Sequence, residues 1–231
     1  MNKKLNKELL IEILSTQASF TEDKAINDLI KGKIEGLGLK YTTDDFGNIY
    51  VIKGKAKTYP CMVSHTDRVH KIHPAFTVFE DDGLLFAFSS SQMTQVGIGG
   101  DDACGVHVCL QALAELEAVK VVFFRFEESG CRGSKVANMN FFKNCNVVLQ
   151  ADRKGGNDFI INGAEIPFSS EKWLTDIAPI LEKHNYKPCL GSVTDVRQLK
   201  ANGLGVCVAN ISAGYHYPHS DKEVVCIEEL E

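Results

Sequence analysis

The sequence predicts an α/β fold with a mostly parallel sheet, and three observations lead to that prediction. Short apolar runs alternate with amphipathic helical segments over most of the chain, which is the pattern of strand–helix–strand units. The run VKVVFFRF at 119–126 is almost wholly apolar, as expected for a strand buried on both faces of a sheet. No internal repeat, low-complexity segment or linker divides the 231 residues, so we expect a single domain spanning 1–231.

The first 50 residues begin with two amphipathic helices. Residues 3–15 place leucine and isoleucine side chains on one helical face. A second apolar stripe with helical spacing follows Thr21, and the glycines at 36 and 38 predict its end. Two short strand pieces are then expected around the turn Phe46-Gly47-Asn48.

Strands and helices alternate in the rest of the chain. YPCMVSH is a short apolar run that ends in polar residues and suits a buried strand, and Asp82-Gly83 is a turn pair typical of a hairpin. The elements expected after residue 58 are a strand at 59–65, a hairpin at 76–89, a helix at 102–117, a strand at 119–126, a helix at 133–142, a strand at 146–152, helices at 173–184 and 194–201, and a strand at 204–211.

Charge and composition exclude several classes of protein. Lys plus Arg number 25 and Asp plus Glu number 30, and the net charge of −5 argues against a binder of nucleic acid or anionic membranes. No stretch approaches the ~20 apolar residues of a membrane helix, and acidic residues interrupt the N-terminal segment too early for a signal peptide. The eight cysteines form no C-x-x-C pair, so we expect buried thiols and a cytoplasmic location.

Residues with the chemistry of metal ligands follow the apolar runs. Because ligands bind outside the carboxyl ends of strands in open α/β sheets, these positions are candidates for one site. They are His65 and Asp67, Glu127 and Glu128, Asp152, His216 and His219, with Asp101 and Asp102 in the loop before the expected helix at 102–117.

Each of these residues also has a simpler interpretation. A His-x-Asp pair is commonly a surface hydrogen bond, Glu127-Glu128 suits the start of a helix, Asp101-Asp102 can cap one, and His219 can be an exposed loop residue. An acidic cluster of this size, however, would repel itself unless cations neutralised it. Mixed imidazole and carboxylate ligands suit zinc, and also cobalt or manganese.

Five separated motifs carry these residues in a fixed order. They are S-H-T-D at 64–67, G-I-G-G-D-D-A-C-G at 97–105, F-E-E-S-G-C-R-G-S at 126–134, Q-A-D at 150–152 and Y-H-Y-P-H-S at 215–220. In order and context they resemble the co-catalytic zinc exopeptidases, a clan that includes the M28 aminopeptidases, the M20 group with peptidase T, and the M42 aminopeptidases. The resemblance implies a three-layer α/β sandwich, with helices on both faces of a mostly parallel sheet.

The resemblance also implies a role for each residue of the motifs. His65 and Asp152 would bind one zinc ion, Glu128 and His219 would bind the other, and Asp101 would bridge the two, with a cis peptide bond between Asp101 and Asp102. Asp67 would orient His65 by accepting its other ring proton, and Glu127 would be the general base. Tyr215 and His216 are candidates for contact with the substrate.

The spacing of the motifs distinguishes branches of the clan. Only 67 residues separate Asp152 from His219, too few for the lid or dimerisation domain of M20 enzymes, and only 36 separate His65 from Asp101, where M42 enzymes carry a larger insert. The chain therefore resembles a bare catalytic domain of the M28 type. We expect an aminopeptidase that acts on short peptides.

Two alternatives remain open at this point. One keeps the metals and changes the substrate, so that the chain would be an amidohydrolase or deacylase of N-acyl amino acids. The other is a non-enzymatic binding protein that has kept the fold. The oligomeric state and the preferred side chain are not indicated by the sequence.

Overall fold

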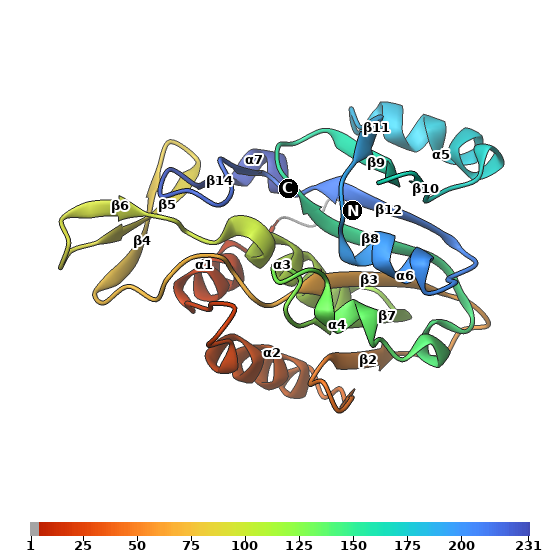
Figure 1. The fold of residues 1–231 in the computed structure, drawn as a ribbon, viewed down its shortest axis with the longest axis horizontal. Helices are drawn as coiled ribbons and strands as arrows, with labels where there is room; N and C mark the ends of the chain where they lie inside the picture. The colour runs from red at the N-terminus through yellow and green to blue at the C-terminus, as the bar shows by residue number, and fades with distance from the viewer. Residues whose placement is uncertain (1–4) are drawn as a thin grey trace.

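The computed structural model describes residues 5–231 and contains two β-sheets with helices between and around them (Figure 1). The larger sheet has nine strands, in the order β1-β2-β7-β3-β8-β12-β9-β10, with β11 paired to β9. Its centre consists of β7 (Val119–Phe124), β3 (Tyr59–His65), β8 (Cys145–Arg153) and β12 (Cys207–Ser212), which run parallel to one another. The predicted fold class is confirmed.

Antiparallel strands border this parallel centre. On one side β2 pairs antiparallel with β7 and β1 with β2; on the other side β9 pairs antiparallel with β12 and β10 with β9. The bounds are Tyr41–Thr43 for β1, Ile49–Lys53 for β2, Asp158–Gly163 for β9, Ile166–Pro167 for β10 and Lys187–Gly191 for β11.

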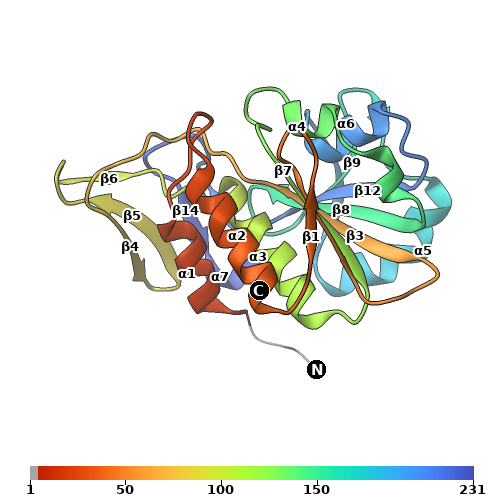
Figure 2. The same cartoon turned by 90° about the horizontal axis from the view of Figure 1, so that it is seen from below.

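Helices cover both faces of the larger sheet, as Figure 2 shows with the sheet seen edge-on. One face packs against α3 (Gly100–Glu115) and α5 (Glu171–Lys183), and the other against α4 (Arg132–Lys135), a 3-10 turn at Met139–Phe142 and α6 (Asp195–Ala201). Because both faces are covered, every residue of β7 is buried, as its apolar sequence predicted.

The smaller sheet has five strands and packs on the far side of α1 (Lys7–Ser15) and α3. Its strands are β4 (Phe76–Asp81), β5 (Leu84–Ser89), β6 (Thr94–Val96), β13 (Tyr215–His216) and β14 (Val224–Cys226), followed by α7 (Ile227–Leu230). The predicted hairpin is confirmed as β4 and β5, and the chain returns near its C-terminal end to extend the same sheet.

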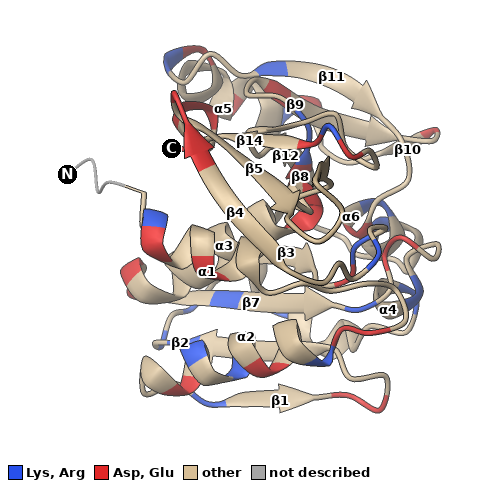
Figure 3. Ribbon diagram, turned by 90° about the vertical axis from the view of Figure 1, so that its left-hand side faces the viewer, with Lys and Arg blue, Asp and Glu red and all other residues tan. Residues whose placement is uncertain are grey.

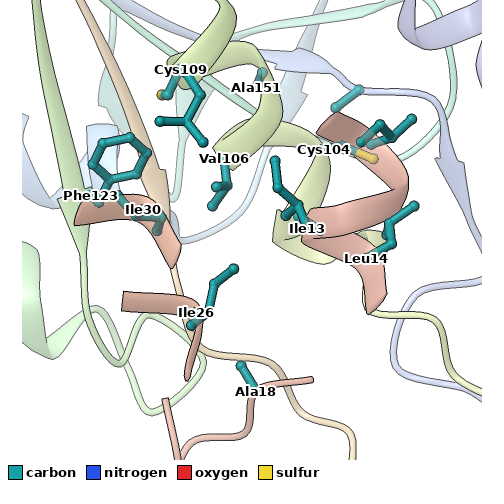
Figure 4. Packing of buried hydrophobic residues seen from close by; sticks show 14 of the residues in the cluster. Ile13, Leu14, Ala18, Ile26, Ile30, Cys104, Val106, Cys109, Phe123 and Ala151 are labelled. Atoms are coloured by element: carbon teal, nitrogen blue, oxygen red, sulfur yellow. The ribbon is translucent and has the colours of Figure 1, made fainter. Parts of the chain in front are cut away.

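The principal core lies between the two sheets. Side chains of α1, α2 (Lys24–Gly36) and α3 meet there with residues from both sheets, and Figure 4 shows Ile13, Ile30, Val106 and Phe123 among them. Acidic and basic residues are interspersed along α1 and α2 (Figure 3). Among the described residues, no helix has the length and apolar character needed to cross a membrane. All eight cysteines are free thiols.

Some expectations require correction. The helix expected at 133–142 is wrong: α4 ends at Lys135, and Asn138 begins a separate 3-10 turn because its side chain accepts a hydrogen bond from the Asn140 amide. Residues 3 and 4 of the first expected helix lie outside the described residues, and α1 begins at Lys7, where the Asn6 side chain caps it. The sequence analysis did not predict the short strands β6, β9, β10, β11, β13 and β14.

Candidate metal centre

The ends of neighbouring parallel strands bring most of the predicted residues together. His65 is the last residue of β3, Glu127 and Glu128 follow β7, and Asp152 lies near the end of β8. Asp101 lies at the start of α3 with non-helical backbone angles, and the peptide bond between Asp101 and Asp102 is cis.

The first of two possible ligand groups contains His65, Asp101 and Asp152, whose ligand atoms all lie within 4.8 Å of one another. His65 Nε2 is 3.2 Å from Asp101 Oδ1 and 3.7 Å from Asp152 Oδ1. His65 is almost fully buried, and its Nδ1 donates to the main-chain oxygen of Asp67 at 3.0 Å. That hydrogen bond leaves the Nε2 lone pair directed at the carboxylates.

The second group contains Asp101, Glu128 and His219, again with all ligand atoms within 4.8 Å of one another. His219 Nε2 is 3.3 Å from Asp101 Oδ2 and 3.1 Å from Glu128 Oε1. Asp101 therefore belongs to both groups and presents a different oxygen to each. This is the arrangement expected of a carboxylate that bridges two cations.

Asp67 holds the strand end that carries the two glutamates. Its Oδ1 accepts the main-chain N–H of Glu127 at 2.9 Å, and its Oδ2 accepts that of Glu128 at 3.2 Å. The same Oδ1 is 3.5 Å from His65 Nδ1, farther than the main-chain oxygen of Asp67. The carboxylate thus aligns the Glu127-Glu128 segment as well as lying beside His65.

Burial and mutual repulsion disturb the ionisation of this cluster. Burial raises the pKa of Glu128 to about 7 and that of Asp152 to about 8, and it raises the pKa of Glu127. The hydrogen bond with Asp101 raises the pKa of His219 to about 9, against the effect of burial. Without metal, protons on the imidazoles compensate part of the excess negative charge.

The donor set fits two divalent cations. Each group offers one imidazole and two carboxylates, and within residues 5–231 no Lys or Arg forms a salt bridge with any of the three carboxylates. Three protein ligands per ion are typical of catalytic sites, which keep a further position open. Burial and mutual repulsion both disfavour the charged form of these carboxylates. A cation in each group would offset both effects.

Residues 48–225 match the family profile of peptidase family M28. The chain belongs to peptidase family M28. No curated protein sequence matches it significantly. The family is one of metallopeptidases, and the pair of ligand groups agrees with its typical requirement for two metal ions.

Three of the solved structures that share the fold of this M28 chain are named as two aminopeptidases and a tripeptidase. Aminopeptidase PepT from Bacillus cereus has a TM-score of 0.79 at 14% identity, over 98% of this chain and 95% of that one. A tripeptidase from Staphylococcus aureus has a TM-score of 0.72 at 14% identity, over 99% and 95%. An aminopeptidase from the archaeon Desulfurococcus kamchatkensis has a TM-score of 0.69 at 20% identity, over 96% and 90%.

A pocket of about 250 Å³ opens over the two ligand groups of this M28 peptidase. Tyr215 lines it, and the Tyr215 hydroxyl donates to Asp152 Oδ1 at 3.3 Å. His216 is not among the lining residues; its Nε2 is 2.5 Å from Glu229 Oε2. Two basic residues, Arg153 and Lys154, line the side of the pocket, where Arg153 pairs with Asp158 at 2.9 Å.

A buried polar network that the sequence analysis did not identify supports Asp152 of the M28 site. Gln150 donates to Asp152 Oδ2 at 2.8 Å, and the Thr194 hydroxyl donates to Gln150 Oε1 at 2.7 Å. Asn210 exchanges hydrogen bonds with the main chain of Asp152, at 2.9 and 2.7 Å. Gln150 and Asn210 lie inside strands; Gln150 belongs to the Q-A-D motif, and for Asn210 the available signal was a polar residue in an apolar run.

Proposed function

We propose that this M28 chain is an aminopeptidase that removes the N-terminal residue of short peptides with the help of two divalent metal ions, zinc foremost. The observation that carries the proposal is the pair of three-residue ligand groups that share Asp101 beneath an open pocket. The names of the structural relatives, two aminopeptidases and a tripeptidase, support peptide termini as the substrate. The proposal treats the chain as a single catalytic domain.

The residues present specify which side chains would hold each ion. His65 and Asp152 would bind one, Glu128 and His219 the other, and Asp101 both. When bound, the ions supply Lewis acidity toward the scissile carbonyl and the attacking water. The preference for zinc rests on the mixture of imidazole and carboxylate ligands, which cobalt and manganese also accept.

Glu127 is the proposed general base. It lines the pocket beside Glu128, its main-chain N–H is fixed by Asp67, and its Oε1 accepts a hydrogen bond from the thiol of Cys131 at 3.2 Å. From this position the carboxylate would take a proton from the attacking water and return it to the leaving amine. Burial, which raises the pKa of Glu127, makes the carboxylate a stronger base.

The test is hydrolysis of a panel of aminoacyl amides and N-acetyl-aminoacyl amides by the zinc-loaded protein. The Glu127→Gln variant should lose roughly 10²–10⁴-fold in kcat because the base is absent, while its zinc content stays at the wild-type value. The matched control is Glu117→Gln. Glu117 is exposed and lies two residues before β7, at the end of that strand opposite the site, so this variant should keep wild-type kcat.

The outcomes separate the alternatives. Cleavage of substrates with a free amine, lost only in Glu127→Gln, supports the aminopeptidase. Cleavage of acylated substrates alone would replace it with a deacylase of N-acyl amino acids. Two bound metals with no turnover of either class would favour a binding protein.

A further inference from the structure

A buried glutamate just after the last motif holds the loop that presents Asp101. Glu223 immediately precedes β14, four residues after His219, and its exposed fraction is 0%. Its Oε2 accepts the main-chain N–H of Gly99 at 2.8 Å, and its Oε1 accepts the main-chain N–H of Asp101 at 3.1 Å. The same Oε2 atom is also 2.7 Å from Nε2 of His70.

Neighbouring side chains pack closely against the 97–101 loop at both Gly97 and Gly99. The side chain of Arg68 passes so close to Gly99 that a Cβ there would lie 2.3 Å from Arg68 Cδ, and the His70 ring would lie 2.0 Å from a Cβ at Gly97. Arg68 is itself buried, and its guanidinium donates to the main-chain oxygen of Ile13 at 2.9 Å, near the end of α1. Glu223, Arg68 and His70 together therefore contact the loop along most of its length.

We propose that Glu223 is a positioning residue that sets the main chain of Asp101 so that one carboxylate oxygen faces His65 and the other faces His219. The inference rests on the proposed function, in which Asp101 bridges the two metals. Glu223 and His219 lie on the same short segment, so the hydrogen bonds of Glu223 also fix the distance between the segment that carries His219 and the loop that carries Asp101. Two of the three members of the second group, Asp101 and His219, are therefore positioned relative to each other through one carboxylate.

The role requires a carboxylate, because both oxygens accept main-chain hydrogen bonds. A glutamine can accept through only one oxygen, and its NH₂ group would face the N–H of either Gly99 or Asp101. One of two buried main-chain donors would then lose its acceptor, whichever way the amide turned. Glu223→Gln is consequently a test of positioning that preserves the size of the side chain.

The experiment measures metal affinity by competition with a chromophoric chelator, together with kcat, KM and the Tm of the metal-free protein. Glu223→Gln should weaken binding of zinc by about 10–100-fold, as changes in residues that orient metal ligands do. We expect a fall in kcat with KM within about twofold, since Glu223 does not line the pocket. The matched control is Asp23→Asn, a buried carboxylate that also accepts two hydrogen bonds, from Arg125, but contacts neither the Asp101 loop nor the segment that carries His219.

The control separates positioning from general stability. Asp23→Asn should lower Tm while zinc affinity and kcat stay at wild-type values. If Glu223→Gln lowers Tm but binds both zinc ions as tightly as the wild type, Glu223 is a structural residue and the inference is overturned. If Glu223→Gln does not fold, amide hydrogen exchange in the wild type decides: protected Gly99 and Asp101 amides support the inference, and fast exchange overturns it.

Failure of this inference is distinguishable from failure of the proposed function. A wild-type chain that binds two zinc ions without hydrolysing any peptide contradicts the aminopeptidase proposal but leaves the Glu223 comparison intact. A wild-type aminopeptidase whose zinc affinity is unchanged by Glu223→Gln contradicts only the inference.

Discussion

Asp101 presents one carboxylate oxygen to His65 and the other to His219. Burial opposes its ionisation, but contacts with His219 and His65 together hold its pKa below the usual range. Asp102 makes different contacts: it accepts hydrogen bonds from the main-chain N–H of His65 and of Gly105, so it caps the regular part of α3, after the kink at 101–102, and joins it to the end of β3. One residue of the pair is placed to bind, and the other to support.

Loss of Asp101 should therefore affect both ions, whereas loss of His219 should affect one. We expect Asp101→Ala to retain neither zinc ion after gel filtration and His219→Ala to retain the ion held by His65, Asp101 and Asp152. Metal analysis of the purified variants gives the zinc content per chain. Equal zinc content in the two variants would contradict a shared ligand.

At the scale of elements, α3 connects the site to the core. It begins at Gly100, directly in the ligand loop, and its apolar face packs between the two sheets through Val106, Leu110 and Leu113. His107 is a buried polar residue in the middle of this helix, and its Nε2 donates to the main-chain oxygen of Asn6 at 3.1 Å, just before α1. Helix α3 is thereby joined to the start of α1.

Burial lowers the pKa of His107, which has a consequence for stability at acid pH. Between that lowered pKa and the ordinary value near 6.5, the unfolded chain binds more protons than the folded chain, so stability falls as the pH decreases. We expect the Tm of the metal-free wild type to fall by more between pH 7.5 and pH 5.5 than the Tm of His107→Leu. In that variant the main-chain oxygen of Asn6 still accepts a hydrogen bond from the Leu10 amide. An equal loss would contradict this account; His184→Leu, at an exposed histidine, serves as the control.

At the scale of the whole molecule, the proposed ligands come from all the layers that surround the principal core. His65 and Asp152 lie in strands of the larger sheet and Glu128 follows another of its strands. His219 lies between β13 and β14 of the smaller sheet, and Asp101 lies at the start of the helix between the two sheets. Bound metals would therefore link the two sheets across α3.

Such a link should appear in the unfolding of the protein. A ligand present at 100 times its Kd stabilises the folded state by about 2.7 kcal/mol per site, and for a chain of this length each kcal/mol raises Tm by roughly 2–4 °C. Zinc at that excess should raise the Tm of the metal-free protein by about 5–10 °C per site, and a chelator should reverse the increase. Calorimetry measures both; the His219→Ala variant should show a smaller increase.

The sequence by itself determined the parallel centre of the sheet and the residues of the two ligand groups. Strands that are buried on both faces must be apolar, so the sequence shows where they end, at the first polar residues. In a parallel sheet the carboxyl ends of neighbouring strands lie side by side. His65, Glu128 and Asp152 could be placed in this way without coordinates, and Asp101 and His219 through the motifs. Strand β9 and its neighbour β11 lacked that contrast, because a partly exposed strand need not be an apolar run.

Only the tertiary structure decided what holds those ligands in place. The hydrogen bond from Gly99 to Glu223 spans 124 residues, and that from Asn48 to Gly133 spans 85, so no local pattern of hydrophobicity or charge marks either pair. A buried glutamate in D-K-E-V-V looks like any solvated charge until the chain returns to the smaller sheet and places it under the Asp101 loop. The local sequence indicates which residues are the proposed metal ligands. Their positions, in contrast, depend on contacts that form only after the two sheets have packed around α3.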